Sequence, residues 1–444
     1  MSRDECDKRR VRYPSISIPA ALLSGLAVLT AVGATAAASS PPLVGTNYTH
    51  YGRYGCSIDG FGIVASGDGE RARIRQQLAA MRAAGIETLR LLVWHQHDME
   101  FHRWGVVSSG AGGIRGAART NLIRYAQDVR AAGFKQLTVA FGPMWTNDPV
   151  GFGVNRWNPS LFEENWSFIR DVRGLVKLHG PPSTRFDLLN EGGPSDHLAT
   201  KAQLADYLAR MYANYVDAFG HEDVTVSSIV AWNDQSRLAN LIDALRSTGR
   251  PLPTWFEVHD GGPALLEGLR ATERTLAAKG LTQPIVLGET SYNEPGGAAA
   301  LKVFASESAR LTEVMQWPLE LGSSCAPLSV SPPYSAGAYV EALTGAPPAT
   351  TLTARVGPGF AVSVKTAYGQ PLTALRAGTY TVAVTDSSTR ESFHLAGPRT
   401  NRATKVRWRG TVSWPLTLRP GTYTYRSDRK GSTVRGRFVV LAGG

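Results

Sequence analysis

The fold of this chain is decided by two stretches, Phe186-Asp187-Leu188-Leu189-Asn190-Glu191 and Ile285-Val286-Leu287-Gly288-Glu289. Each is an apolar run typical of a buried parallel strand, and each ends in a glutamate. Barrel enzymes carry their chemistry at the carboxyl ends of the strands, so Glu191 and Glu289 would occupy catalytic positions in a barrel. The two acids are 98 residues apart, and only a closed fold would bring them together.

A repeated unit surrounds these stretches: a helix-like segment, a glycine and a short apolar strand. Its clearest copies begin at Ala83-Ala84-Gly85-Ile86, Ala131-Ala132-Gly133-Phe134 and Ala278-Lys279-Gly280-Leu281. Glycine ends a helix at low cost because it adopts a left-handed backbone without strain. Strands that alternate with amphipathic helices indicate parallel βαβ units.

Eight strands are predicted in roughly 300 residues, which is typical of a (β/α)8 TIM barrel. They are Leu43–Tyr48, Thr88–Trp94, Leu137–Phe141, Phe186–Asn190, Val224–Trp232, Thr254–His259, Ile285–Glu289 and Glu313–Trp317. Helices are predicted between them, among them Glu70–Ala84, Phe162–Leu178, Lys201–Phe219 and Ala264–Lys279. An open doubly wound sheet would need a glycine-rich phosphate loop after the first strand, and none follows it. We therefore expect an α/β fold with a TIM barrel over residues 41–345.

The periodicity changes after Thr344-Gly345-Ala346-Pro347-Pro348, and residues 346–350 are predicted to be a linker. Beyond it, side chains alternate between apolar and polar, as they do in half-buried strands. The alternating runs are Thr379–Val384, Ser413–Leu418, Thr422–Tyr425 and Arg437–Leu441. Residues 351–444 are therefore predicted to form a small antiparallel β-sandwich.

Two carboxyl groups that face one cleft are what the hydrolysis of a glycosidic bond requires. One stays ionised and attacks the anomeric carbon, while the other starts protonated and gives its proton to the leaving group. A cation such as Arg90, in the second predicted strand, would lower the pKa of an acid beside it, and a poorly solvated pocket would raise the pKa of the other acid. The alternative is a structural role, with the acids buried in an ion pair with Arg90.

The Asn190-Glu191 pair and Glu289, which end the fourth and seventh strands, resemble the clan A glycoside hydrolases, notably family five and its cellulase and mannanase relatives. The resemblance covers about residues 43–345. It implies that Glu191 is the acid/base, that Glu289 is the nucleophile and that Asn190 holds the sugar 2-hydroxyl. With these roles, Arg90 is expected to lower the pKa of Glu289, and the pocket of Glu191 is expected to raise the pKa of that acid. Three further residues match the family at strand positions: Arg90, His259 and Trp317. Clan members retain the anomeric configuration, which implies carboxyl groups about 5–5.5 Å apart.

Aromatic side chains near the strand ends are expected to bind the sugar. Three tryptophans offer a flat apolar face for a pyranose ring, with a place in the core as the alternative: Trp94, Trp145 and Trp317. The family usually has an aromatic residue two positions after the strand-six histidine, where this chain has Gly261. Tyr292 is the expected substitute. Glu257 and Glu294 are rival acids near the same rim.

Three histidines follow the second predicted strand, at His95, His97 and His102. A His-x-His pair is able to bind zinc, but no third ligand stands at a metal-site spacing. We expect these side chains to bind substrate or to support the loop. No metal and no cofactor is predicted for this chain.

Residues 351–444 resemble plastocyanin-like cupredoxin domains. The matching parts are Gly378-Thr379-Tyr380, Phe393-His394-Leu395-Ala396-Gly397-Pro398 and Leu418-Arg419-Pro420-Gly421-Thr422-Tyr423-Thr424-Tyr425. At the positions where copper-bearing relatives have ligands, this chain has Glu391, Ser427 and Lys430. A blue-copper site needs a thiolate and two imidazoles, so the resemblance implies a cupredoxin fold that holds no copper.

The positive charge of the chain is concentrated in this last domain. The whole chain has a net charge of +11, and residues 351–444 contain 15 Lys and Arg against 3 Asp and Glu. A field of this kind favours acidic partners such as a cell-wall polymer, although a basic surface also serves solubility alone. Alternation along Lys405-Val406-Arg407-Trp408-Arg409 would put the three basic residues on one face of a strand.

Residues 1–40 are typical of an export signal. Lys8, Arg9, Arg10 and Arg12 precede an uncharged stretch that ends in small residues suited to signal peptidase. An uncleaved membrane anchor is the alternative. In an oxidising compartment, Cys56 and Cys325 are expected to form a disulfide.

We interpret the sequence as an exported, retaining β-glycoside hydrolase that acts on a polysaccharide or oligosaccharide by a two-glutamate double displacement. A secreted or cell-surface monomer is expected, with no nucleic-acid partner and an anionic cell-wall polymer as a candidate partner of the basic domain. Two alternatives remain: a transglycosidase that uses the same acids, and a catalytically silent carbohydrate-binding or cell-surface scaffold protein. An electron-transfer copper protein is disfavoured by its missing ligands.

Overall fold

The computed structural model describes residues 40–50, 62–98, 105–110, 112–150, 157–231, 234–291, 294–317, 337–344, 351–357, 361–366, 372 and 374–441. Several predictions concern positions outside this set: residues 1–39 of the export signal, the linker 346–350, Cys56, Cys325, His102 and Tyr292. No helix in the described ranges is both long and apolar enough to span a membrane.

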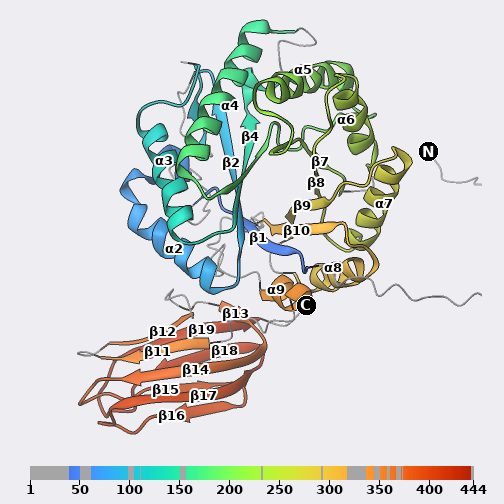
Figure 1. Ribbon diagram of the computed structural model, residues 1–444. Coiled ribbons are helices and arrows are strands. Elements are labelled where there is room, and N and C mark those ends of the chain that lie inside the picture. Colours follow the sequence, from blue (N-terminus) through green and yellow to red (C-terminus); the bar gives the residue numbers. More distant parts are fainter. Residues whose placement is uncertain are drawn as a thin grey trace, which may run out of the picture. The chain divides into compact units, whose positions relative to one another are not determined.

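The first part of the chain is a nearly closed barrel of parallel strands (Figure 1). In chain order the strands are β1 (Leu43–Asn47), β2 (Thr88–Gln96), β3 (Val107–Ser108), β4 (Gln136–Pro143), β5 (Ser183–Asp187), β6 (Val224–Thr225), β7 (Ser227–Ile229), β8 (Phe256–His259), β9 (Ile285–Thr290) and β10 (Leu311–Gln316). They pair in the order β6-β5-β4-β2-β1-β10-β9-β8-β7, and β3 adds to β2. Only Val226 separates β6 from β7, so the sheet returns almost to its starting point. The predicted α/β barrel is confirmed.

Helices surround the strands, as Figure 1 shows. They are α1 (Ile63–Ser66), α2 (Arg71–Ala83), α3 (Gly116–Ala131), α4 (Pro159–His179), α5 (Lys201–Phe219), α6 (Ser236–Arg246), α7 (Leu265–Ala278), α8 (Pro295–Glu307) and α9 (Gly337–Thr344). The apolar residues of α5 recur every three or four positions, and that face is buried: Leu204, Tyr207, Leu208, Met211, Tyr212 and Tyr215. The glycines predicted to end helices have positive φ, at 84° for Gly85, 79° for Gly133 and 69° for Gly280.

The predicted strands all occur, with ends that shift by a few residues. The shift that matters is in β5, which ends at Asp187 rather than at Asn190. The backbone N–H of Asn190 still donates to the carbonyl of Phe141, at 2.8 Å, before the chain turns away. Glu191 therefore lies on a turn beyond the strand and not at its last residue.

The last part of the chain forms two sheets. One has the order β12-β11-β14-β17 and the other β13-β19-β18-β15-β16. Their strands are β11 (Thr351–Val356), β12 (Val362–Thr366), β13 (Ala374–Arg376), β14 (Gly378–Asp386), β15 (His394–Gly397), β16 (Thr400–Ala403), β17 (Gly410–Leu418), β18 (Gly421–Arg426) and β19 (Arg435–Leu441). One apolar cluster contains side chains of both sheets, among them Val382 and Leu416 from the first and Tyr423 and Phe438 from the second.

Two predictions for this domain are wrong. The pairs β11–β14 and β13–β19 are parallel, so the sandwich is not purely antiparallel. In each of these pairs the two strands are distant in the sequence, and only strands joined by a tight hairpin are forced to run in opposite directions. Lys405–Arg409 is a loop between β16 and β17, because Arg407 has a φ of 67°, which breaks an extended strand.

Candidate active site

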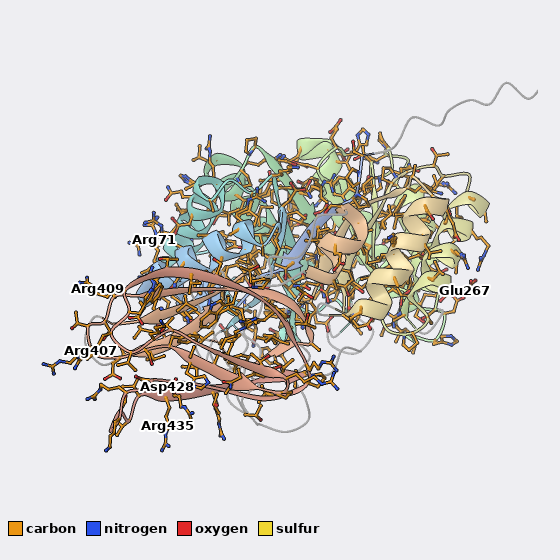
Figure 2. The ribbon with its side chains drawn as sticks, turned by 90° about the horizontal axis from the view of Figure 1, so that it is seen from below. Arg71, Glu267, Arg407, Arg409, Asp428 and Arg435 are labelled. Carbon is orange, nitrogen blue, oxygen red and sulfur yellow. The ribbon has the colours of Figure 1, made fainter. Side chains whose placement is uncertain are left out.

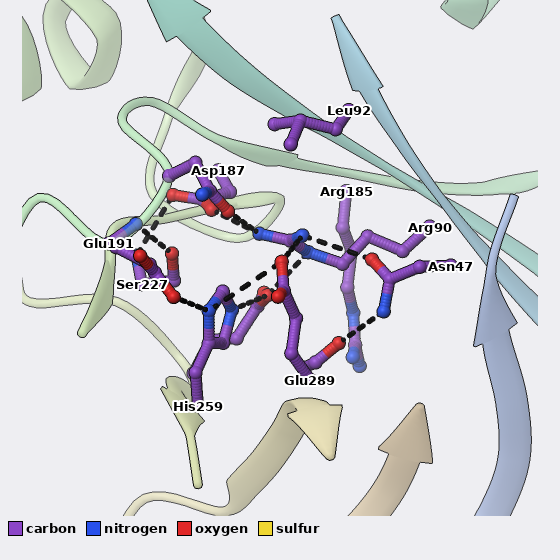
Figure 3. Close-up of polar contacts among 12 residues, drawn as sticks. Asn47, Arg90, Leu92, Arg185, Asp187, Glu191, Ser227, His259 and Glu289 are labelled. Atoms are coloured by element: carbon purple, nitrogen blue, oxygen red, sulfur yellow. Dashed lines mark hydrogen bonds and ion pairs between the residues drawn. The ribbon is translucent and has the colours of Figure 1, made fainter. Parts of the chain in front are cut away.

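Polar side chains from widely separated strands converge at one end of the barrel (Figure 3). Most of the group lies at or beyond the carboxyl ends of strands, and three residues lie earlier on theirs, namely Arg90, Ser227 and Glu257. The members are Asn47 on β1, Arg90 on β2, Asp187 on β5, Asn190 and Glu191 after β5, Ser227 on β7, Glu257 and His259 on β8 and Glu289 on β9. This is the end of a parallel barrel where its enzymes place their chemistry.

Arg90 is the centre of the group and is fully buried. Its Nη1 donates to Asn47 Oδ1 at 3.1 Å and to Glu289 Oε1 at 2.7 Å. Its Nη2 donates to Asp187 Oδ2 at 2.8 Å and to Asn190 Oδ1 at 2.7 Å. The guanidinium thus fixes the position of Glu289 and of the turn that carries Asn190, and both were predicted site residues.

Glu257 is a further partner of the Arg90 guanidinium. Its Oε1 forms an ion pair with Arg90 Nε at 2.7 Å, and neither side chain is exposed. Gly288 makes room for this carboxylate, because a Cβ at that position would lie 2.1 Å from Glu257 Oε1. Burial raises the pKa of Glu257, but Arg90 and His259 outweigh burial and lower it overall. Glu257 is therefore an ionised part of the support.

His259 lies between three carboxylates. Its Nδ1 is 3.2 Å from Glu191 Oε1 and 3.6 Å from Glu289 Oε1, and its Nε2 is 3.4 Å from Glu257 Oε1. Because a carboxylate faces each ring nitrogen, both nitrogens must carry a proton to avoid repulsion between lone pairs. Burial disfavours the charged ring, but the three acids outweigh it and raise the pKa of His259 to about 10. His259 is an imidazolium at neutral pH.

Glu191 has an unusual backbone. Its φ is 55°, a left-handed conformation that costs a residue with a side chain on the order of 1–3 kcal/mol. Its N–H donates to Ser227 Oγ at 2.8 Å, which holds the turn. The side chain is 36% exposed, against 18% for Glu289 and 3% for His259. Strain here places one carboxylate where a ligand from solvent is able to reach it.

The pKa directions of the two acids differ from the sequence-based expectation. Burial would raise the pKa of Glu191, but the hydrogen bond and charge of His259, with Arg90, lower it overall. Burial raises the pKa of Glu289 despite His259 and Arg90. The expectation considered Arg90 alone, whereas the imidazolium of His259 lies closer to Glu191 than to Glu289. The proton expected on Glu191 is held by His259.

The cluster of Glu191, His259 and Glu289 also has the residue types of a metal site. Each offers one ligand atom, and these atoms lie within 4.8 Å of one another. A metal needs a free lone pair on the imidazole. His259 Nδ1 carries a proton that it shares with Glu191. The geometry therefore fits a proton shared between His259 and Glu191 better than it fits a metal ion.

The three predicted tryptophans lie near the same end of the barrel. Trp94 lies on β2 with the same parity as Arg90, and its half-buried ring covers Gly142 of β4. Trp145 follows β4 and is 51% exposed, with a φ of 45°. Trp317 follows β10 and is half-buried, and its N–H donates to the carbonyl of Thr290. Strain and exposure together make Trp145 the best placed of them to contact a ligand.

His95 and His97 belong to a separate polar network. His95 Nδ1 is 3.1 Å from Ser109 Oγ, and His97 Nδ1 is 2.5 Å from Glu164 Oε2. Ser109 in turn donates to Glu164. Burial lowers the pKa of His95 to about 3, so its ring is neutral. These side chains connect the end of β2 to Ser109 and to Glu164 of α4, and a structural role was one of the sequence-based alternatives.

Sequence reasoning did not single out Asn47, Asp187 and Ser227. Asp187 Oδ1 accepts from the backbone N–H of Ser227 at 2.9 Å, and Asp187 is fully buried. Asn47 Nδ2 donates to the carbonyl of Gly288 at 2.9 Å. A signal for Asp187 was available, because a charged residue inside an apolar strand needs a buried partner.

No family model matches the sequence, and no curated protein matches it. Solved structures of similar fold include a GH5_18 protein from Bifidobacterium longum subsp. infantis, which is 14% identical, with a TM-score of 0.50 and coverage of 75% of this chain and 85% of that chain. A modular endo-β-1,4-mannanase of glycoside hydrolase family 26 from Cellulomonas fimi is 12% identical, with a TM-score of 0.42 and coverage of 90% and 94%. A glucosidase from Croceicoccus marinus is 10% identical, with a TM-score of 0.45 and coverage of 86% and 94%. At these identities the likeness shows the fold alone, a barrel of the kind that glycoside hydrolases have.

Proposed function

We propose that this protein is a retaining β-glycoside hydrolase in which Glu289 is the nucleophile and Glu191 the acid/base. One observation carries the proposal: of two partly exposed glutamates, Glu289 lies near the end of β9 and Glu191 just after β5, and one oxygen of each lies within 4.8 Å of the other. This separation supports the retaining arrangement, since inverting enzymes leave about 6.5–9.5 Å between the two carboxyl groups for a water molecule.

The reaction proceeds in two displacements. Glu289 attacks the anomeric carbon as the bond to the leaving oxygen breaks, and Glu191 gives that oxygen its proton. The resulting glycosyl ester on Glu289 is then cleaved by water, whose proton returns to Glu191. Arg90 holds the Glu289 carboxylate in place and also donates to Asn190 Oδ1. The Nδ2 group of Asn190 is the proposed partner of the sugar 2-hydroxyl.

The proton for the first step is shared between His259 and Glu191, which are 3.2 Å apart. As the carboxylate of Glu289 bonds to the anomeric carbon it gives up its charge, so one of the three carboxylates that stabilise the His259 imidazolium is lost in that same step. The pKa of His259 therefore falls while the leaving oxygen is taking its proton from Glu191, so His259 passes its proton to Glu191 more readily. Glu257 keeps the ring charged until that moment.

Replacing Glu191 by alanine is expected to separate substrates by their leaving groups. Aryl β-glycosides with a good leaving group need no proton, so the rate constant of their first displacement should change little. Substrates with a poor leaving group should lose roughly two to four orders of magnitude in kcat/KM. The measurement is a plot of log kcat/KM against leaving-group pKa for both proteins, and equal slopes would contradict the assignment.

Replacing Glu257 by glutamine is expected to move the alkaline limb of the pH–rate profile to lower pH. Glutamine has the shape of glutamate and fits beside Gly288, but it removes a charge that keeps His259 protonated up to about pH 10. Without this charge the pKa of His259 should fall by about one unit or more. The imidazolium is then lost at a correspondingly lower pH. Glu313→Gln is the control, because Glu313 is a buried barrel acid that pairs with Arg185 and not with His259. Identical alkaline limbs in wild type and Glu257→Gln would contradict this role.

Export is part of the same proposal. It rests on the signal-like residues 1–40, and a secreted or cell-surface location follows from it. The Cys56–Cys325 disulfide stays a prediction of the sequence. Catalysis is favoured over a silent scaffold role, because Arg90, His259 and the strained Glu191 together hold two acids in position for chemistry. A polysaccharide or oligosaccharide substrate is part of the proposal.

A further inference from the structure

The C-terminal sandwich contains a basic segment with no acid in it. Between Ser392 and Ser427 the chain has seven Lys and Arg and neither Asp nor Glu. Five of these residues lie close together in the chain, in the β15–β16 turn, on β16 and in the loop that follows. All five are exposed: Arg399, Arg402, Lys405, Arg407 and Arg409. We refer to these five residues as the basic edge, because β16 is the last strand of its sheet.

The acids of this domain do not neutralise the basic edge. The domain has three acids, and two of them, Asp386 and Glu391, are buried. Glu391 pairs with Arg429 at 2.8 Å. Asp428 pairs with His394 at 2.7 Å and lies 3.5 Å from Arg426. In the described part of the chain, no residue of the basic edge forms an ion pair.

Two residues of the basic edge occupy backbone positions that disfavour arginine. Arg399 and Arg407 have φ values of 55° and 67°, where glycine or asparagine costs less. Figure 2 shows the side chains of Arg407 and Arg409 projecting away from the strands. Exposed arginines that occupy strained positions and form no ion pair with the described residues are better explained by an external ligand than by folding.

The surface around the basic edge is hollowed and has little exposed apolar area, which does not favour a membrane. Arg399 and Arg402 line an open hollow of about 510 Å³, together with residues that include Asn401 and Leu416. Trp408 is half-buried over Gly410, between two arginines. Among the described residues of the loop that follows β16, Val406 is the only large apolar side chain that is strongly exposed, at 39%. One such side chain is too little for insertion into lipid.

We propose that the basic edge docks an acidic polysaccharide through its carboxylate groups. Four of its five residues are arginines, whose planar guanidinium groups bind carboxylates by two parallel hydrogen bonds. The choice of a carbohydrate rests on the proposed function, because docking would raise the concentration of substrate near a barrel that cleaves sugars. A nucleic acid or an anionic lipid surface is a competing outcome of the test.

The test is the binding of the full chain to immobilised polygalacturonate, with a neutral polysaccharide as reference. Wild type should be retained at low ionic strength and released as salt is raised, since exposed charges are screened within about 10 Å at 0.1 M salt. The triple variant Arg402→Gln/Lys405→Gln/Arg409→Gln should bind about tenfold more weakly, from three exposed ion pairs. It leaves the strained Arg399 and Arg407 untouched and should fold normally.

A matched variant separates a specific surface from net charge. Arg355→Gln/Arg390→Gln/Arg437→Gln removes the same charge from other exposed positions of the domain and should bind as wild type does. Equal losses in the two triple variants would overturn the proposal. A competition experiment also tests it, in which free polygalacturonate, duplex DNA or phosphatidylglycerol vesicles release the protein from the immobilised polymer. Release by fewer charge equivalents of DNA or of vesicles than of polygalacturonate would overturn the proposal.

The outcome is independent of catalysis. A Glu289→Ala protein should bind the polymer as wild type does, and the triple variant of the basic edge should cleave a small aryl glycoside at the wild-type rate. Loss of polymer binding in Glu289→Ala would mean that the barrel, not the basic edge, holds the polymer. Loss of binding only in the edge variant would support the proposal, whatever the barrel hydrolyses.

Discussion

Glu289→Ala protein is expected to lose roughly four orders of magnitude in kcat towards every β-glycoside that the wild type cleaves, because no other group takes the place of a nucleophile. The side chain is held by Arg90 at 2.7 Å, and its removal leaves a space beside the anomeric carbon. Added azide should enter that space and restore turnover of substrates with good leaving groups. The product should be an α-glycosyl azide, which NMR of the reaction mixture identifies.

Glu294→Ala is the control for this experiment. Glu294 was a rival acid in the sequence, but its side chain accepts from the backbone of Gly296 and Gly297 at the start of α8. Its loss should weaken the helix cap by about 1 kcal/mol and leave kcat unchanged. A Glu289→Ala protein that keeps near-wild-type activity would remove the nucleophile assignment, and a β-configured azide product would remove the retaining mechanism.

Arg90→Met protein is expected to be destabilised by about 3–5 kcal/mol, because the change leaves buried carboxylates without their cation. Asp187 and Glu257 are fully buried, and Glu289 is mostly so. Burial would lower the pKa of Arg90, but these three acids outweigh burial and raise it, so the guanidinium stays charged throughout the working range of pH. Urea unfolding at neutral pH measures the loss.

The control for Arg90 is Arg210→Met, which breaks an exposed ion pair with Asp206 on α5 and should change stability little. Arg90→Lys is a stricter test, because one ammonium group cannot reach the five partners that the planar guanidinium serves. Full wild-type stability in Arg90→Met would mean that the neighbouring acids are protonated. In that case the electrostatic account of the site would be wrong.

Local signals explain why the barrel was predictable. The glycines that end helices, the apolar strands and the amphipathic helices are each set by a few adjacent residues, and their order in the chain fixes a parallel barrel. The C-terminal domain was less predictable. The left-handed Arg407 interrupts a run that alternates like a strand, and parallel pairing of β11 with β14 depends on residues that are far apart in the sequence.

Sequence reasoning named most of the residues that meet in the site, but not their charge states. Arg90, Asn190, Glu191, His259 and Glu289 come together as the family resemblance implied. Their support was missed, because Asn47 and Asp187 look like ordinary strand residues until the barrel closes around them. The roles of the assembled residues remain proposals that the variants above test.

What the sequence by itself determined is the periodic alternation of strands and helices and the position of a glutamate after each of two strands. Only the tertiary structure decided where the proton lies. Glu191 is 68 residues from His259 in the chain, and Arg90 is 199 residues from Glu289. A pKa depends on burial and on charges within a few ångströms, and neither exists until the barrel brings these side chains together.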